Sequence, residues 1–156
     1  MNWRPSSPTR VAGAGRPRRT ETLDASRPVR YHPAVPSPTS PIERLRDSCL
    51  SLPEAYEKQS HGEPTFWVGK RMFATFADAA NHHGGGRHAV WCKSDFVTQD
   101  LLVRSAPDRY YIPPYVGPSG WLGIYLDRRP SWKAVEERLQ AAYLLVAPKR
   151  LAAALR

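Results

Sequence analysis

The hydrophobic positions of the chain fall at helical spacing in two long segments. The first segment carries an apolar stripe formed by Ile42, Leu45, Cys49 and Leu52. The run Ser40-Pro41-Ile42-Glu43 marks its start, with Ser at the N-cap, Pro at the first helical position and Glu at the third. In this arrangement the Ser hydroxyl and the Glu carboxylate each accept a hydrogen bond from the other residue's backbone N–H. We therefore predict a helix that begins at Pro41 and ends before Pro53.

The second segment predicts a longer helix near the C-terminus. Its apolar positions are Trp132, Val135, Leu139, Ala142, Tyr143 and Val146. These positions lie on one helical face. Ser131 is the expected N-cap, and Pro148 separates this helix from a short terminal helix over 149–156.

A shorter helix is predicted in the middle of the chain. Ser94 or Asp95 can cap it, and it ends before Pro107. Its apolar residues are Phe96, Leu101 and Leu102.

The remaining apolar segments are short and rich in residues that favour strands. They predict strands over 55–60, 65–68, 72–76, 88–93, 110–112 and 121–126. The connection Val68-Gly69-Lys70-Arg71 is short and contains glycine, so it joins the second and third strands into a β-hairpin with a basic tip. The order helix, four strands, helix, two strands, helix predicts an α+β fold, in which helices cover a mainly antiparallel sheet.

Charge and composition divide the chain at about residue 40. Residues 1–40 hold seven prolines, seven arginines and two acidic residues, a net charge of 7 − 2 = +5. Residues 41–156 hold 16 basic and 12 acidic residues, a net charge of 16 − 12 = +4. Because large apolar residues are few in 1–40, we expect a disordered Pro/Arg-rich tail there and a single domain over 41–156.

Three interpretations of the tail remain open. The first is a solvated linker or an extended start of the reading frame, which the composition favours. The second is an arm that binds polyanions through the cluster Arg16-Pro17-Arg18-Arg19. The third is a transit peptide, which the dense prolines oppose because they break the required amphipathic helix.

The apolar runs and the cysteine count exclude several classes of protein. No apolar run reaches the 18 residues of a membrane span, and the N-terminus lacks the apolar stretch of a signal peptide. Two cysteines, Cys49 and Cys92, are too few for a disulfide framework or a four-cysteine zinc site. We therefore expect a cytoplasmic monomer without membrane association, cofactor or metal.

Candidate catalytic groups do not combine into a site. Cys92 and His88 share one face of a predicted strand but lie about 13 Å apart along it, too far for a hydrogen bond. We predict that Cys92 is a core residue. His82 and His83 lie beside the run Gly84-Gly85-Gly86, which lacks the spacing of a phosphate-binding loop. The expectation is that the protein is not an enzyme.

Basic and aromatic residues occur at the ends of the predicted elements. The candidate DNA-binding residues are Lys70, Arg71, Arg87, Lys93, Tyr115, Trp121, Arg128 and Arg129. Basic side chains at these places can reach phosphates without disturbing the core. Tyr115 and Trp121 border a Pro/Gly-rich loop, where aromatic rings can stack on bases. The alternative is that the charges only solubilise the surface and that Trp121 is in the core.

Three segments, in this order, resemble the MmcQ/YjbR-like family. The best matches are Gly69-Lys70 with Phe73-Ala74, Trp121 with Leu126-Asp127, and Tyr143 before Pro148-Lys149. The resemblance covers roughly 42–155. It implies an α+β fold related to the CyaY-like arrangement and a DNA-binding role through two β-hairpin wings. Lys70 and Arg71 would belong to the first wing and the 115–121 segment to the second. No catalytic residues come with the family.

Two hypotheses of different classes follow. The first is a DNA-binding module that contacts mainly backbone phosphates, with low sequence specificity. The second is a small-ligand or protein-interaction domain with no DNA role, whose cleft is lined by Tyr110, Tyr111, Trp121 and Tyr125. One continuous basic face across both hairpins would favour DNA. A concave aromatic pocket with dispersed charges would favour a ligand.

Overall fold

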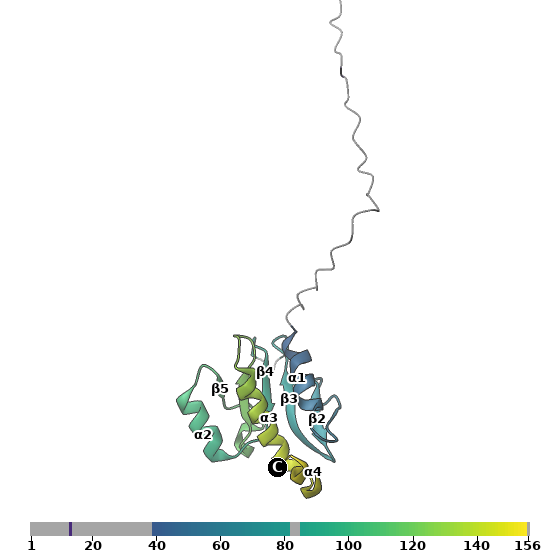
Figure 1. Cartoon of the computed structure of the whole chain (residues 1–156). Coiled ribbons are helices and arrows are strands. Elements are labelled where there is room, and N and C mark those ends of the chain that lie inside the picture. Colours follow the sequence, from purple (N-terminus) through teal and green to yellow (C-terminus); the bar gives the residue numbers. More distant parts are fainter. Residues whose placement is uncertain (1–12, 14–38, 82–84, 156) are drawn as a thin grey trace, which may run out of the picture. The chain divides into compact units, whose positions relative to one another are not determined.

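The computed structural model describes Gly13, residues 39–81 and residues 85–155. Its elements are α1 (Pro41–Leu50), β1 (Tyr56–Glu57), β2 (Thr65–Val68), β3 (Arg71–Ala77), β4 (Ala89–Cys92), α2 (Phe96–Ser105), β5 (Tyr110–Tyr111), a 3-10 turn (Gly117–Ser119), β6 (Leu122–Tyr125), α3 (Trp132–Val146) and α4 (Lys149–Ala154). Figure 1 shows their arrangement. Of the predicted tail, only Gly13, Thr39 and Ser40 are described, so its interpretation lies outside these residues. No described helix has both the length and the apolar character needed to cross a membrane.

The strands form one six-stranded antiparallel sheet in the order β1-β2-β3-β4-β6-β5. The predicted hairpin is present, with Gly69 and Lys70 in the turn between β2 and β3. A register shift beside Phe66 and Trp67 marks an irregularity between these two strands. The α+β architecture predicted from the order of elements is confirmed. The predicted first strand is present but shorter, since only Tyr56 and Glu57 pair regularly.

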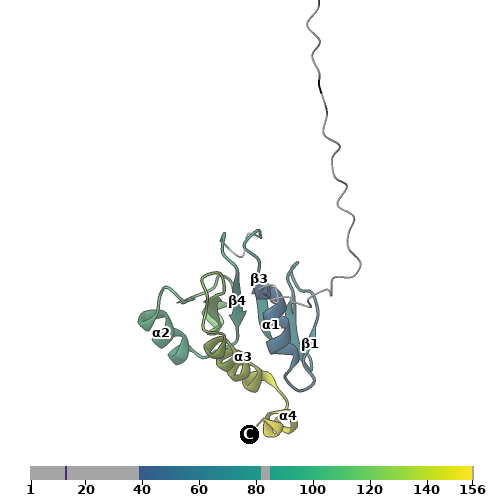
Figure 2. The same cartoon turned by 45° about the horizontal axis from the view of Figure 1, so that its top comes forward.

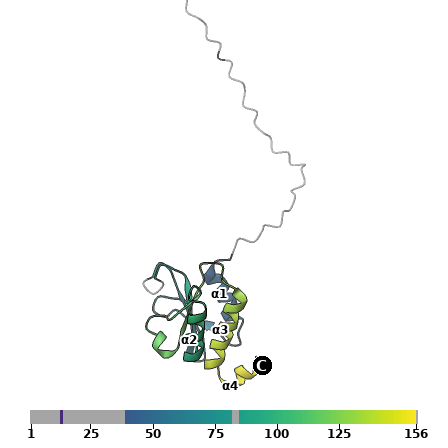
Figure 3. The ribbon, with the colours of Figure 1, turned by 90° about the vertical axis from the view of Figure 1, so that its left-hand side faces the viewer.

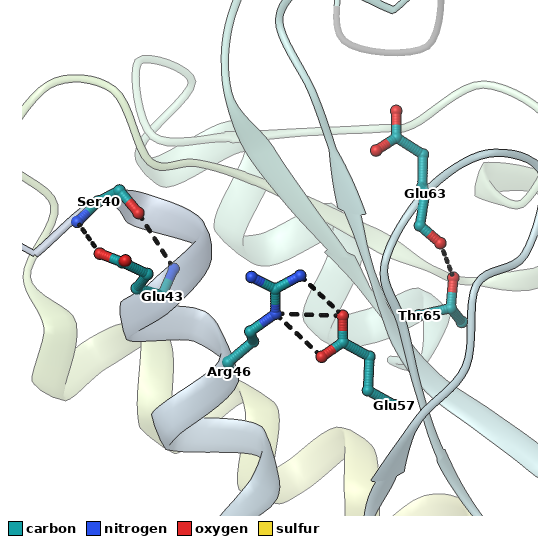
Figure 4. A network of polar contacts seen from close by, with 6 residues as sticks. All are labelled: Ser40, Glu43, Arg46, Glu57, Glu63 and Thr65. Atoms are coloured by element: carbon teal, nitrogen blue, oxygen red, sulfur yellow. Dashed lines mark hydrogen bonds and ion pairs between the residues drawn. The ribbon is translucent and has the colours of Figure 1, made fainter.

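Helix α1 begins as its first residues predict. The backbone N–H of Glu43 donates to Ser40 Oγ at 3.4 Å, and the N–H of Ser40 donates to Glu43 Oε2 at 3.1 Å (Figure 4). The hydrogen bond from the Ser40 backbone N–H lowers the pKa of the Glu43 carboxyl group. One turn later, Arg46 forms a two-atom ion pair with Glu57, at distances from 2.9 to 3.1 Å. This pair ties α1 to the edge strand β1.

Helices α1 and α3 lie side by side on one face of the sheet (Figures 2 and 3). Tyr143 of α3 is fully buried there, and its ring packs edge-on against Phe73 of β3, with centroids 5.6 Å apart. The Tyr143 hydroxyl donates to the Pro53 carbonyl oxygen at 2.6 Å. One side chain therefore joins α3, the centre of the sheet and the segment that follows α1. This face holds the larger of the two hydrophobic clusters.

The opposite face of the sheet, here called the distal face, carries a chain of aromatic contacts. Trp91 Nε1 donates to the Tyr111 hydroxyl at 2.7 Å. The Tyr111 ring stacks on Tyr125, with centroids 4.5 Å apart and planes 20° apart. The Arg87 guanidinium lies 3.5 Å from the centre of the Tyr125 ring. These four side chains run across three neighbouring strands, β4, β6 and β5, to the loop before β4.

Helix α2 holds the loop over 112–121 against the distal face. Its N-cap is Asp95, one of the two predicted candidates, which accepts from the Thr98 N–H at 2.8 Å. The buried Gln99 amide donates to the carbonyl oxygens of Gly117 and Trp121, at 2.9 and 2.6 Å. Of the three apolar residues expected on this helix, Leu102 packs on the core, whereas Phe96 and Leu101 are exposed. The polar Gln99 therefore makes the contact that fixes the loop.

We expect Gly123→Ala to destabilise the protein. A Cβ at this position would lie 2.5 Å from Cε1 and Cζ of the Tyr111 ring, which Trp91 and Tyr125 hold in place. Overpacking of this kind costs about 1–3 kcal/mol. Urea denaturation measures the decrease in stability. The same substitution in a Tyr111→Ala background is the control, because the obstructing ring is then gone. An equal decrease in both backgrounds would show that the ring is not the cause.

The stability of the protein should fall in strongly alkaline solution because of Tyr111. Burial raises the pKa of its hydroxyl to about 12 in the folded chain, against 10.0 for an ordinary tyrosine. Between these pH values the unfolded chain loses this proton while the folded chain keeps it, so rising pH favours unfolding. Denaturation of wild type and Tyr111→Phe at several values from pH 9 to 11.5 compares the slopes. The wild-type slope should be the steeper one, and parallel curves would contradict the prediction.

Candidate functional site

The eight candidate DNA-binding residues do not lie on one continuous face. Ala77 pairs with Ala89, and Ala89 pairs with Tyr125, so the end of β3, the start of β4 and the end of β6 meet at one end of the sheet. Arg87, Arg128 and Arg129 flank this end, here called the arginine end. Lys70, Arg71 and Lys93 flank the opposite end, here called the hairpin end. The length of β3, roughly 20 Å for seven residues, separates the two ends.

At the hairpin end the predicted basic tip is present and exposed. Gly69 adopts a φ of 58°, which glycine tolerates at little cost, and the Tyr56 hydroxyl donates to its carbonyl oxygen at 2.6 Å. Lys70 follows in the turn, and Arg71 is the first residue of β3. Lys93 is half-buried just after β4. This end therefore offers two exposed charges, Lys70 and Arg71, at a turn that the Tyr56 hydroxyl supports.

The two aromatic candidates differ in accessibility. Tyr115 is 72% exposed and can contact a partner. Trp121 is only 4% exposed and packs in the distal cluster with Ala77, Ala89 and Trp91. The prediction that Trp121 stacks on a base is wrong, because the sheet and the 112–121 loop enclose its ring. The alternative, that Trp121 is a core residue, is confirmed.

Arg87 is already bound within the protein. Its Nε and Nη2 donate to the two carboxylate oxygens of Asp127, both at 2.8 Å, and its guanidinium lies over Tyr125. The Arg87 hydrogen bonds lower the pKa of the Asp127 carboxyl group. A guanidinium that donates two hydrogen bonds to one carboxylate is fixed in position, and the two charges cancel. Arg87 therefore has a structural role at the arginine end and adds little attraction for phosphate.

A cleft at the arginine end collects further arginines. It has a volume of about 210 Å³ and includes Arg109, Arg128 and Arg129 in its lining, together with Asp108. The Arg109 carbonyl oxygen accepts from the Tyr125 N–H at 3.0 Å, which places β5 and its preceding arginine beside the end of β6. None of these three arginine side chains forms an ion pair with another residue in the described part of the chain.

The first turn of α3 opens beside this cleft. Ser131 is its N-cap, as predicted, and accepts from the Ala134 N–H at 3.4 Å. Ser131 and Ala134 also line the cleft. The backbone N–H groups and the dipole at the start of a helix favour anions. Sequence reasoning missed Arg109 because it follows a Pro-Asp pair, away from both hairpins, and only the pairing of β5 with β6 brings it here.

The cleft predicted for a small ligand is not formed by the four expected aromatic residues. Tyr110 and Tyr125 line the arginine cleft, Tyr111 stacks on Tyr125, and Trp121 is enclosed. A different hollow of about 330 Å³ lies on the distal face, lined mainly by Met72, Phe76, Trp91, Tyr115 and Val116. The charges are thus dispersed and an aromatic hollow is present, although it consists of other residues.

The candidate reactive groups are not brought together: Cys92 is buried, the His88 side chain is 41% exposed, and two histidines lie outside the described residues. Cys92 is 1% exposed, which confirms the predicted core position, and burial raises the pKa of its thiol to about 12. The His88 ring stacks on Phe76, and its Nδ1 accepts from the Ala79 N–H at 3.1 Å. His82 and His83 are not among the described residues. Within the described ranges no three His, Cys, Asp or Glu side chains are grouped as metal ligands would be.

Comparison with known proteins identifies the family. The YjbR family model matches residues 50–145, which is over half of the chain. The fold is similar to the crystal structure of the Deinococcus radiodurans protein DR2400, which carries the domain DUF419. That comparison has a TM-score of 0.60 and 22% sequence identity, and it covers 74% of this chain and 90% of that chain. None of the curated proteins compared with the chain matches it. The structural likeness shows a shared fold, and the length of the family match shows that the chain belongs to the YjbR family.

Proposed function

We propose that this protein binds duplex DNA through contacts to backbone phosphates at the arginine end of the sheet. The observation that carries the proposal is the cleft in which Arg109, Arg128 and Arg129 meet without carboxylate partners among the described residues. With Asp108 included, and with Arg87 and Asp127 cancelling each other, these groups have a net charge of 3 − 1 = +2. Guanidinium groups are suited to phosphate because they donate two parallel hydrogen bonds.

The surroundings of the cleft extend its positive character along the chain. The segment Arg128-Arg129-Pro130-Ser131-Trp132-Lys133 holds three basic residues and no acidic one. Its exposed side chains lie at the start of α3, where the helix dipole adds to the attraction for an anion. Contacts of this kind position a duplex but read no bases, so binding has low sequence specificity and strong salt dependence.

The proposal places the phosphate contacts outside both expected wings, because Arg109, Arg128 and Arg129 lie in neither the Lys70–Arg71 turn nor the 115–121 segment. Lys70 and Arg71 lie at the hairpin end, roughly 20 Å away along the sheet. The two ends are therefore separate candidates, and charge substitutions at one end serve as the matched control for the other.

We expect Arg128→Ala/Arg129→Ala to weaken DNA binding of the full chain and to flatten its salt dependence. Each phosphate that an arginine neutralises contributes roughly 0.9 to the slope of log K against log salt, so the slope should become shallower by about 1.8. Fluorescence anisotropy with a labelled duplex, measured at several salt concentrations, gives both quantities. Lys70→Ala/Arg71→Ala removes the same charge and should leave affinity and slope close to those of the wild type.

Three results would overturn this assignment. A larger effect of the Lys70/Arg71 pair would place the contacts on the hairpin. Unchanged binding in both pairs, with weaker binding on substitution of Arg16, Arg18 and Arg19, would assign binding to the N-terminal segment. Failure of the full chain to bind DNA at physiological salt would reject a DNA-binding role.

A further inference from the structure

The hollow on the distal face has the form of a small-ligand site. Its volume of about 330 Å³ lies at the lower end of the range for such sites. Trp91 and Met72 come from the sheet, and Tyr115 and Val116 come from the loop that faces it. The polar part of the lining consists of Ser60, His61, Glu63, Thr65 and Thr75. That combination binds a ligand body by burial and orients it by its polar group.

Glu63 lines this hollow and carries a buried carboxylate. The residue is 5% exposed. Its Oε1 accepts from the Asp78 backbone N–H at 3.3 Å and from the side-chain amide of Asn81. Both donors are neutral, and none of the ion pairs in the described part of the chain includes Glu63. Burial of a carboxylate is costly without a cationic partner, so a positive group in the hollow would be favoured.

The wall opposite the sheet is fixed in place. The Gln99 side-chain amide donates to the carbonyl oxygens of Gly117, the first residue of the 3-10 turn, and Trp121, which follows the turn, and so anchors the loop. Tyr115 has a φ of 64° although it is not glycine, a backbone conformation that residues with a Cβ adopt only at an energetic cost. It also exposes most of a large ring to solvent. The loop therefore holds an aromatic ring at the rim of the hollow.

We infer that this hollow binds a small organic cation with a planar aromatic body, about the size of an arylethylamine. The ammonium group would lie against Glu63, and the ring would lie between Trp91 and Tyr115. Aromatic faces also attract cations, which adds to the preference. The carboxylate repels phosphate, so this site is distinct from the proposed DNA surface, and neither proposal depends on the other.

Tryptamine is the probe that tests this inference on the full chain. Two analogues share its ring and differ in charge: neutral 3-propylindole and anionic indole-3-propionate. Isothermal titration calorimetry should show tryptamine binding at least tenfold more tightly than either analogue, as expected for a hydrogen bond to a charged group. Equal affinities for all three compounds, or no binding of tryptamine at millimolar concentration, would overturn the inference.

Two substitutions locate the binding. Glu63→Gln keeps an oxygen for the Asp78 N–H and the Asn81 amide but removes the charge, so it should lower tryptamine affinity about tenfold and abolish the preference over 3-propylindole. Glu137→Gln makes the same change on the exposed face of α3 and should have no effect. Tyr115→Ala should weaken the binding of both tryptamine and 3-propylindole. This variant provides a readout if Glu63→Gln fails to fold. Wild-type affinity in both Glu63→Gln and Tyr115→Ala would reject the site.

Discussion

The contact of Tyr143 with Phe73 and Pro53 organises the rest of the structure. Its ring packs on the centre of the sheet, and its hydroxyl satisfies a carbonyl oxygen in the segment that leads from α1 to β1. Because α1 and α3 must both lie on this face to share that contact, the distal face is left to the aromatic side chains and the 112–121 loop. Both candidate sites depend on this division. The arginine cleft lies where β6 leads into α3, and the hollow lies on the distal face.

The two sites differ in the sign of their charge. At the arginine end, Arg87 and Asp127 neutralise each other and leave the surrounding arginines as the dominant charges. On the distal face, Glu63 is the buried charge, with neutral donors around it in the described structure. An anion would therefore bind at the arginine cleft and a cation at the hollow on the distal face. The aromatic chain from Trp91 to Arg87 runs between them.

The sequence predicted the elements well where the information was local. The Ser40 to Glu43 run specifies its own cap, and the stripe ending at Val146 places α3, because both depend on residues within a few positions of each other. Contacts between distant segments could not be obtained in this way. The burial of Trp121, the anchoring role of Gln99 and the approach of Arg109 to Arg128 all require strand order and register. For the same reason, a pattern of basic residues at element ends did not reveal that they divide between two ends of the sheet.

The pairing order has a further consequence for how the folded chain meets other copies of itself. Both outer strands, β1 and β5, pair over only two residues each, and the four longer strands lie between them. An exposed strand edge offers unpaired N–H and C=O groups that can template growth of a sheet from one molecule to the next. Here the outermost strands present very short edges, while the longer strands have neighbours on both sides. Such edges give an incoming strand little to extend, so the sheet itself opposes edge-to-edge aggregation.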